Sequence, residues 1–427
     1  MRILAKIVSV LLPAIVIVAA CSHPVNTVTQ LLGSVPSDAS AVFCFNTCAQ
    51  GTALMLDSTD VLCRCIPQKY SRSPLVLSWC YNGNIVPLLA IQTPPDSSSA
   101  LKEALRAASS LGVEAAFVSS PKALPGRGVL LLSRSESVVE SSCRHLQSGA
   151  SVLDAPGFRA ALDKAPEAEA LFFLNNRSVS KWLDSRPLTG VFRRSELVSF
   201  IRRTAEWSVL YMPDIQDSGN LSAVSSQGPS DSWYCNLLES QKPARSRMAE
   251  ILPPDADFAM SLVIADTDSF REAYIRYLDA SVRLNRYRNA CTSLSRCSGI
   301  HPEKWEKDNQ VREVGLLHRD GSSVLLVRLA KSAGRDGEQL RENPFGGFLA
   351  VLYGDAFRLD EESVMAFKDH WMVVGKAGDV ESLLKCGPSP EEELWPSKPC
   401  RFAAISRMGD RSFRFFFDSD CYRLHVY

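Results

Sequence analysis

The sequence predicts an α+β protein with two related domains of antiparallel sheet, each with helices packed on one face of the sheet. Apolar runs of strand length are joined by tight turns, and amphipathic stretches of helical length lie between some of them. Several of these segments recur in the same order in the second half of the chain. Because the strands follow one another as hairpins, without a regular alternation of strand and helix, antiparallel pairing is expected.

The first recurring segment is a proline-aspartate turn that precedes an apolar strand. Val35–Ala41 reads VPSDASA, and Leu252–Phe258, 217 positions later, reads LPPDADF. The strands expected after these turns are Val42–Phe45 and Ala259–Ile264. Each predicted domain therefore opens with the same kind of turn and strand.

The second recurring segment is a β-hairpin. Leu75–Ile91 contains Asn82-Gly83, a pair that supplies the two positive φ angles of a type I′ turn. Val311–Leu329 contains Asp320-Gly321, 238 positions after the first turn, and predicts the same hairpin.

The third recurring segment is a strand that leads into a short helix. Leu130–Arg134 matches Met372–Lys376 at an offset of 242 positions. Three matches in one order, with an offset that grows mainly once, predict an internal duplication with one insertion. We expect the insertion in a long helix from Ser269 to Leu284, which begins with the capping box Ser269-x-x-Glu272. Its counterpart near Thr52–Asp57 is short.

Two further helices and the domain boundaries follow from local signals. Ser99–Leu111 is amphipathic and ends at Gly112, and Asp154 is expected to cap a helix that continues through Leu162. The polar, turn-rich stretch before the second Pro-Pro-Asp places a boundary near residue 245. The expected organisation is a signal peptide (1–20), a tether (21–33), a first α+β domain (34–245) and a second α+β domain (246–427).

Residues 1–21 have the three parts of a secretory signal. Arg2 and Lys6 form a basic region, an uncharged apolar run covers residues 7–18, and small residues precede Cys21. The sequence Val18-Ala19-Ala20-Cys21 resembles the lipobox of bacterial lipoproteins, in which the cysteine sulfur receives a diacylglyceryl group and the preceding peptide bond is cut. We therefore expect Cys21 to be the lipidation site, with palmitate-type acyl chains, and to be the first residue of the mature chain.

Two alternatives to this lipoprotein signal are an uncleaved signal anchor and cleavage after Ala20 without lipidation. The apolar run is shorter than the roughly 20 residues that span a bilayer, and Pro13 interrupts it, which disfavours the anchor. Two or three acyl chains on Cys21 are enough for stable membrane attachment without a spanning helix.

The charge of the chain is balanced, which is not typical of proteins that bind nucleic acid. Removal of residues 1–20 leaves 45 basic and 47 acidic residues, a net charge of −2. Nucleic-acid binding depends on a basic face that releases counterions, so no nucleic-acid partner is expected. One stretch is locally rich in arginine, and a solvated helix face is the interpretation we favour for it. Its residues are Arg271, Arg276, Arg283, Arg286, Arg288 and Arg296.

The 13 cysteines suggest buried thiols or disulfides more than a metal site. Cys44 with Cys48 and Cys291 with Cys297 are close enough in sequence to be disulfide candidates. A single residue separates Cys63 from Cys65, whereas a zinc knuckle needs at least two residues between its thiols and a second pair of matching spacing. The sequence has no such second pair. No metal ligand and no cofactor are predicted.

Catalytic motifs are weak throughout the chain. Ser119 with Lys122 and Ser178 with Lys181 have the Ser-x-x-Lys spacing of penicillin-recognising enzymes, but the companion elements of those enzymes are missing. The six histidines have no ligand spacing. They are His23, His145, His301, His318, His370 and His425. We therefore predict no catalytic residue.

The chain resembles a loose group of uncharacterised bacterial envelope lipoproteins. The resemblance rests on the lipobox, on the "lP-x-D-a" strand starts at Pro36–Ala39 and Pro253–Ala256, and on Leu153–Leu162, which fits a shared helix pattern. It implies an envelope location and a duplicated α+β unit, and it carries no catalytic residues. Ser22, directly after the lipidated cysteine, resembles the pattern of lipoproteins sorted to the outer membrane, on its periplasmic face.

The function expected from these observations is that of a lipid-anchored envelope protein that binds a protein or a glycan without catalysis. Its membrane contact is expected through Cys21. The alternative is an envelope hydrolase whose active site is assembled from residues distant in the sequence.

Overall fold

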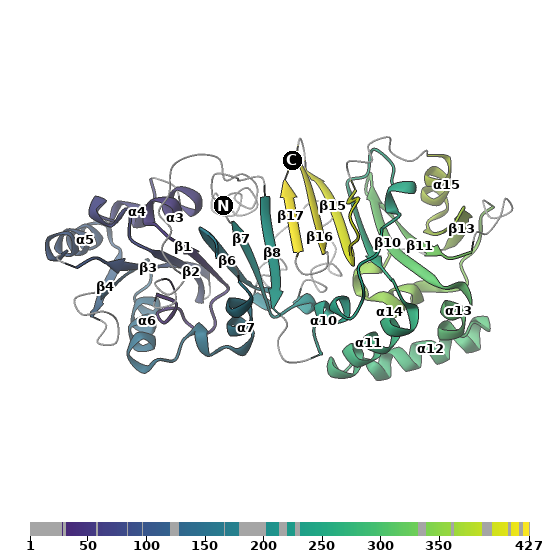
Figure 1. The fold of residues 1–427 in the computed structure, drawn as a ribbon, viewed down its shortest axis with the longest axis horizontal. Coiled ribbons are helices and arrows are strands. Elements are labelled where there is room, and N and C mark those ends of the chain that lie inside the picture. The colour runs from purple at the N-terminus through teal and green to yellow at the C-terminus, as the bar shows by residue number, and fades with distance from the viewer. Residues whose placement is uncertain are drawn as a thin grey trace. The chain divides into compact units, whose positions relative to one another are not determined.

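The structure is a computed structural model that divides into two compact units, each described here by itself (Figure 1). The residues it describes are 28, 31–56, 59–82, 84–95, 97–119, 128–165, 167–178, 202–212, 220–226, 231–331, 339–359, 363–386, 395–408, 411–417 and 422–426. Of these, the first unit contains residues 28–178 and 206–226, and the second contains residues 202–205 and 231–426.

The first unit is an antiparallel sheet with helical connections. Its strands are β1 (Ala41–Phe45), β2 (Leu75–Asn82), β3 (Asn84–Thr93), β4 (Glu114–Ser119), β5 (Gly128–Ser133), β6 (Ala170–Asn175), β7 (Trp207–Met212) and β8 (Asn220–Ser226). Its helices are α3 (Cys48–Met55), α4 (Val61–Arg64), η1 (Gln68–Tyr70), α5 (Ser98–Leu111), α6 (Glu136–Ser148), η2 (Val152–Asp154) and α7 (Pro156–Lys164). The pairings give the strand order β4-β5-β3-β2-β1-β6-β7-β8.

The second unit is also an antiparallel sheet. Its strands are β9 (Phe258–Val263), β10 (Val311–Arg319), β11 (Ser322–Leu329), β12 (Arg341–Glu342), β13 (Val364–Lys368), β14 (Trp371–Gly375), β15 (Phe402–Met408), β16 (Arg411–Phe417) and β17 (Tyr422–Val426). Its helices are α10 (Tyr234–Glu239), η4 (Met248–Glu250), α11 (Thr267–Ala280), α12 (Leu284–Ser298), α13 (Pro302–Asn309), η6 (Gly346–Phe348), α14 (Leu349–Tyr353), η7 (Asp355–Phe357) and α15 (Ala377–Lys385). The strand order is β12-β13-β14-β11-β10-β9-β15-β16-β17. The predicted α+β class with two sheet domains is confirmed.

The second unit begins earlier in the chain than the boundary that we expected near residue 245. The reason is packing: α10 lies against α11, with the rings of Tyr234 and Tyr277 5.5 Å apart, and Ala244 forms a β-bridge with Cys400. Residues 231–245 are therefore part of the second unit.

The two sheets follow one plan. The strand order of the second unit matches that of the first, strand for strand. The strands that correspond to β1 through β8, taken in turn, are β9, β10, β11, β13, β14, β15, β16 and β17. Strand β12 is an addition at one edge of the second sheet. The registers agree as well. Phe43 faces Leu77 across β1 and β2, and the residue 217 positions after Phe43, Met260, faces Leu316 across β9 and β10.

The segments before β1 and β9 repeat this correspondence at the same offset of 217 positions. The amide of Ala39 donates to the carbonyl of Pro36, and the amide of Ala256 donates to that of Pro253. Next, the amide of Ser40 donates to the carbonyl of Trp79 in the first unit, and the amide of Asp257 donates to the carbonyl of His318 in the second. The repeated Pro-x-Asp turn thus has one local structure in both units.

The two hairpins occupy equivalent places, because β2–β3 and β10–β11 each lie beside the strand that opens the unit. Asp320 and Gly321 have φ angles of 50° and 81°, the left-handed values that a type I′ turn requires. In the first hairpin, Asn82 pairs with Asn84, and Gly83 lies outside the described residues.

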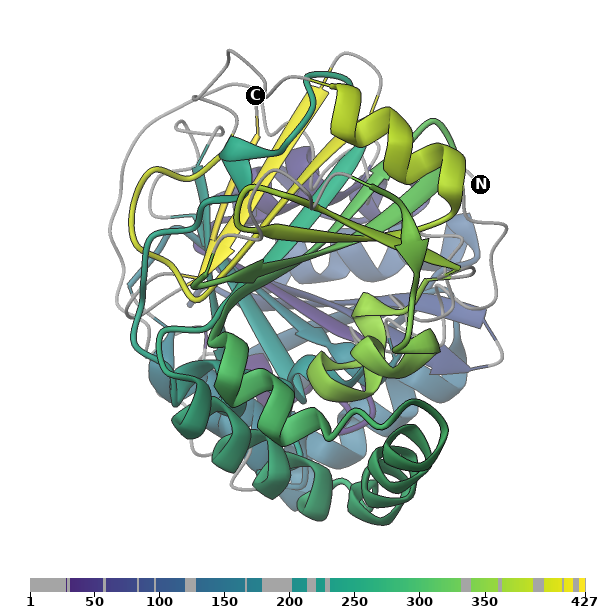
Figure 2. The same ribbon diagram turned by 90° about the vertical axis from the view of Figure 1, so that its right-hand side faces the viewer.

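Helices cover both faces of each sheet, not one face as we expected. In the first unit α3 packs on the side of Phe45 and Leu75, whereas Val139 of α6 and Phe158 of α7 join the core formed with Val42 on the other side. In the second unit α15 lies on one side of the sheet, and α11, α12 and α14 lie on the other (Figures 1 and 2). The physical reason is that the central strands are apolar on both sides, so both faces must be removed from water.

The insertion is not the single long helix that we predicted from Ser269 to Leu284. Helix α11 begins at Thr267, where Asp266 accepts a hydrogen bond from the Ser269 amide at 2.6 Å, so Asp266 is the cap. The helix ends at Ala280, and Val282 has a φ of 59° before α12 begins. The extra length of the second unit is therefore spread over α11, α12 and α13, in place of the short α3, α4 and η1.

The two other helix predictions have different outcomes. Helix α5 ends at Gly112, whose φ is 66°, as predicted. Asp154 does not cap the helix that follows it: its carboxylate accepts from the Ser151 amide at 2.7 Å and closes the capping box of η2. Helix α7 then starts with Pro156 at its first turn.

The close packing of α3 on the sheet can be tested by a substitution at Gly51. A Cβ at this position would lie 2.5 Å from Cδ2 of Leu75 and 2.7 Å from the ring of Phe45, both fully buried. We expect Gly51→Ala to lower the free energy of unfolding by about 1–3 kcal/mol through overpacking. Gly378→Ala in α15 is the matched control, because an added Cβ at this position would have no atom of another segment within 4 Å. This substitution should raise the free energy of unfolding by about 0.5–1 kcal/mol. Urea unfolding measures both, and a Gly51→Ala chain as stable as the natural one would contradict the packing described.

Candidate functional site

The predicted lipidation site and the lysine of each Ser-x-x-Lys pair lie outside the described part of the chain. Cys21, Lys122 and Lys181 are not among the described residues. Ser119 ends β4, and Ser178 donates its amide to Asn175 Oδ1 at 3.1 Å. Neither Ser-x-x-Lys pair is therefore tested by the described residues, which contain the serine of each pair and not the lysine.

Two histidines contact serine side chains. His318 Nδ1 lies 3.0 Å from Ser323 Oγ, and these residues are direct partners across β10 and β11. His145 Nε2 lies 3.1 Å from Ser141 Oγ, one turn earlier in α6. Both contacts follow from regular secondary structure, in which cross-strand partners and residues four apart on a helix are neighbours.

Three buried cysteines, Cys44, Cys48 and Cys80, are not activated thiols. Burial raises the pKa of Cys44 and Cys48 far above the usual range, and it raises the pKa of Cys80 to about 12. The thiolate, which is the nucleophilic and metal-binding form, is therefore disfavoured at these positions. Neither predicted disulfide is formed, since Cys44, Cys48, Cys291 and Cys297 are all thiols. Within the described ranges no three His, Cys, Asp or Glu side chains are grouped so as to hold a metal ion.

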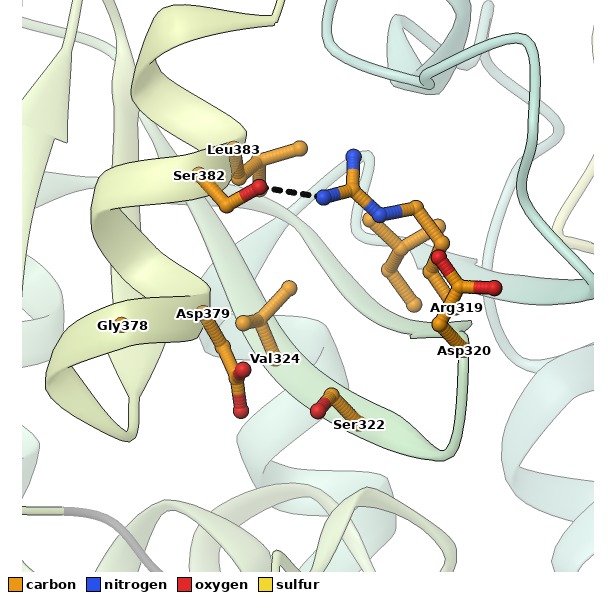
Figure 3. A pocket seen from close by; sticks show the side chains of 9 residues that line it. Arg319, Asp320, Ser322, Val324, Gly378, Asp379, Ser382 and Leu383 are labelled. Atoms are coloured by element: carbon orange, nitrogen blue, oxygen red, sulfur yellow. Dashed lines mark hydrogen bonds between the residues drawn. The ribbon is translucent and has the colours of Figure 1, made fainter.

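A polar cavity lies between the tip of the β10–β11 hairpin and helix α15 (Figure 3). Its volume is about 290 Å³, close to the lower limit of small-molecule sites. Apolar side chains of the sheet and helix and several polar side chains form its wall. The lining residues are Leu317, Arg319, Asp320, Ser322, Val324, Gly378, Asp379, Ser382 and Leu383.

Arg319 is held in place from two directions. Its guanidinium donates to Ser382 Oγ of α15, the hydrogen bond drawn in Figure 3, and lies 3.6 Å from the Asp255 carboxylate. The amide of Asp320 donates to Asp257 Oδ2 at 3.0 Å. The two aspartates of the Leu252–Phe258 segment, Asp255 and Asp257, therefore fix the hairpin tip that forms the cavity.

The groups in the cavity are suited to recognise a polar ligand. One guanidinium, the carboxylates of Asp320 and Asp379 and the hydroxyl of Ser322 supply both donors and acceptors. Leu317, Val324 and Leu383 add apolar contact area. Sequence analysis recognised the Asp-Gly turn and the Pro-Pro-Asp segment but not their contact, because some 60 residues separate them in the chain.

We expected the arginine-rich stretch to form a solvated helix face. For Arg271 this prediction is wrong, because its side chain is buried. The side chain forms a forked ion pair with Glu306, with nitrogen–oxygen distances of 2.7 to 2.9 Å. It also donates to the Leu352 carbonyl at 3.0 Å and lies over the rings of Tyr274 and Tyr353. Arg283 is also largely shielded from solvent and bonds Asp355. These two arginines stabilise the packing of α11, α13 and α14, whereas Arg276, Arg286, Arg288 and Arg296 are exposed.

Glu313 is a second buried carboxyl group. It accepts hydrogen bonds from the hydroxyls of Ser246 and Ser261 and from the Arg247 amide at 2.8 Å, and Trp395 donates to Ser246 Oγ at 2.7 Å. Burial raises the pKa of Glu313, and these hydrogen bonds limit the increase.

The raised pKa of Glu313 predicts a pH-dependent contribution to stability. The folded chain favours the protonated form, so the stabilisation is complete below the unfolded pKa near 4.5 and is lost as pH rises through the folded pKa. Relative to Glu313→Gln, the natural chain should lose up to about 1.4 kcal/mol per pH unit across that window. Glu272→Gln, on the exposed side of α11, is the control and should follow the natural chain. Parallel stability curves for the natural chain and Glu313→Gln between pH 4 and 8 would show that the burial of Glu313 has no such effect.

Comparison with known proteins gives no further identification. No family model, no curated protein and no solved structure matches this chain. In the part of the chain that the structure describes, none of the helices has both the length and the apolar character needed to cross a bilayer.

Proposed function

We propose that this protein is an exported envelope lipoprotein that binds a polar ligand, a protein segment or a glycan, without chemical conversion. The observation that carries the proposal is the sequence Val18-Ala19-Ala20-Cys21 at the end of a secretory signal. Acyl chains on Cys21 hold the folded units at the membrane, and Ser22 favours the periplasmic face of the outer membrane. The resemblance to uncharacterised envelope lipoproteins agrees with this location.

The cavity of Figure 3 supports a binding role. Its polar side chains come from a hairpin tip and from helix α15. The hydrogen bond from Arg319 to Ser382 connects these two elements, so the donors and acceptors are fixed before a ligand arrives. Preorganised groups of this kind lower the entropic cost of binding. Hydroxyl and amide groups of a glycan or a peptide are the chemistry that a guanidinium and carboxylates recognise.

The anchor is tested by Cys21→Ser in the natural host. We expect the variant to move from the membrane fraction to the soluble fraction, because the acyl chains and not a spanning helix hold the protein. Cys297→Ser, which removes an exposed thiol elsewhere, is the control and should stay in the membrane fraction. Palmitate labelling and intact mass measure the modification, and a membrane-extracted chain without added acyl mass would refute the anchor.

Probe labelling of the purified natural chain tests the proposal that the protein does not catalyse a reaction. We expect no labelling by a fluorophosphonate probe for serine hydrolases. Labelling that is abolished by Ser323→Ala, which removes the hydroxyl beside His318, would replace the binding role with that of a hydrolase.

A further inference from the structure

A basic cluster lies in the second unit where α11 is followed by α12. Asp355 forms ion pairs with three arginines: Arg203, Arg283 at 2.9 Å and Arg358 at 3.5 Å. Arg286, on the first turn of α12, borders the same place. Four guanidinium groups and one carboxylate leave an excess of three positive charges.

A small cavity of about 30 Å³ opens at this cluster. Arg283, Arg286 and Arg358 line it together with Tyr287 and Asp355. A cavity needs roughly 10–15 Å³ of such volume to hold one water molecule, so this cavity accepts no more than the end of a small anionic group. Drug-sized ligands need roughly 300 Å³ or more, which excludes a whole nucleotide from the cavity itself.

The local electrostatics favour an anion here. Asp355 cannot neutralise all the arginines that surround it, and the side chains of Asp355 and Arg283 are only 25% and 19% exposed, so solvent screens their charges incompletely. Helix α12 also begins at this point, with Arg283 as its N-terminal cap residue and no acidic residue in its first turn. The partial positive charge of a helix N-terminus adds to that of the arginines.

We propose that this cluster, named the Asp355 arginine site, binds a phosphate group. Guanidinium groups match the oxygens of a phosphate group. The three arginines that line the cavity exceed the single carboxylate of Asp355 by two positive charges, which favours an anionic group with several oxygens. The group is presented either by an anionic lipid headgroup or by a soluble phosphate compound. Exposed Arg286 makes the first contact, while Arg283 is fixed by hydrogen bonds to Tyr277 at 2.9 Å and to Asp355.

The test is titration of the full chain with inorganic phosphate, followed by calorimetry, against chloride at equal ionic strength. We expect saturable binding of phosphate only. Arg286→Gln should raise the phosphate Kd about tenfold or more, because it removes a charge-assisted hydrogen bond without disturbing a buried contact. Arg288→Gln is the matched control: it removes the same charge from the exposed side of the same helix but lies outside the cavity, and its Kd should change less than twofold.

A vesicle experiment distinguishes the two sources of the phosphate. The Cys21→Ser chain is used, so that acyl chains cannot insert. Binding to phosphatidylglycerol vesicles but not to phosphatidylcholine vesicles, lost in Arg286→Gln, identifies a lipid headgroup. Phosphate binding without vesicle binding identifies a soluble compound. Equal effects of phosphate and chloride, or equal loss of affinity in Arg286→Gln and Arg288→Gln, would overturn the site.

Discussion

Burial of the central strands on both faces is the constraint on which each unit depends. Every residue of β1 and of β9 is buried, so neither sheet can leave a side in water. Apolar surface on both faces must be covered, and the connections between strands supply the cover. This requirement explains why helices follow β1 and β5 in the first unit, and β9 and β14 in the second.

One plan is used in both units, but the chemistry inside the cores differs. Cys44 faces Val76 in the first unit, and the equivalent pair in the second is Ser261 and Gly315. The missing side chain at Gly315 leaves space for Met248, whose Cε lies only 3.0 Å from where a Cβ would be. The Ser261 hydroxyl bonds the buried Glu313. The second unit has therefore replaced an apolar contact with a polar network, and the sheet register tolerates the change.

Sequence analysis predicted the features that depend on local chemistry. The Asp320-Gly321 turn and the end of α5 at Gly112 were correct, because positive φ angles limit the choice of residue at both. The two-sided cover was missed although Ala41–Phe45 is apolar at each position, a pattern typical of a strand buried on both faces.

Features that depend on tertiary packing could not be predicted from spacing. Arg271 looked like one of several helix arginines, and its burial depends on Glu306, 35 positions later, and on rings from other helices. The cavity at the hairpin tip depends in the same way on contacts of Arg319 with Asp255 and Ser382. No local pattern marks such pairs, because their partners meet only after the strands have paired.

Amide hydrogen exchange measured by mass spectrometry tests the central claim, that the two units share one doubly buried sheet plan. Peptides covering β1 and β9 should be among the slowest to exchange in their units, with comparable protection, because both strands are hydrogen-bonded on either side and covered on both faces. Peptides from the exposed turn around Val282 should exchange fast. If β9 exchanges as fast as that turn while β1 remains protected, the two units do not share the plan described.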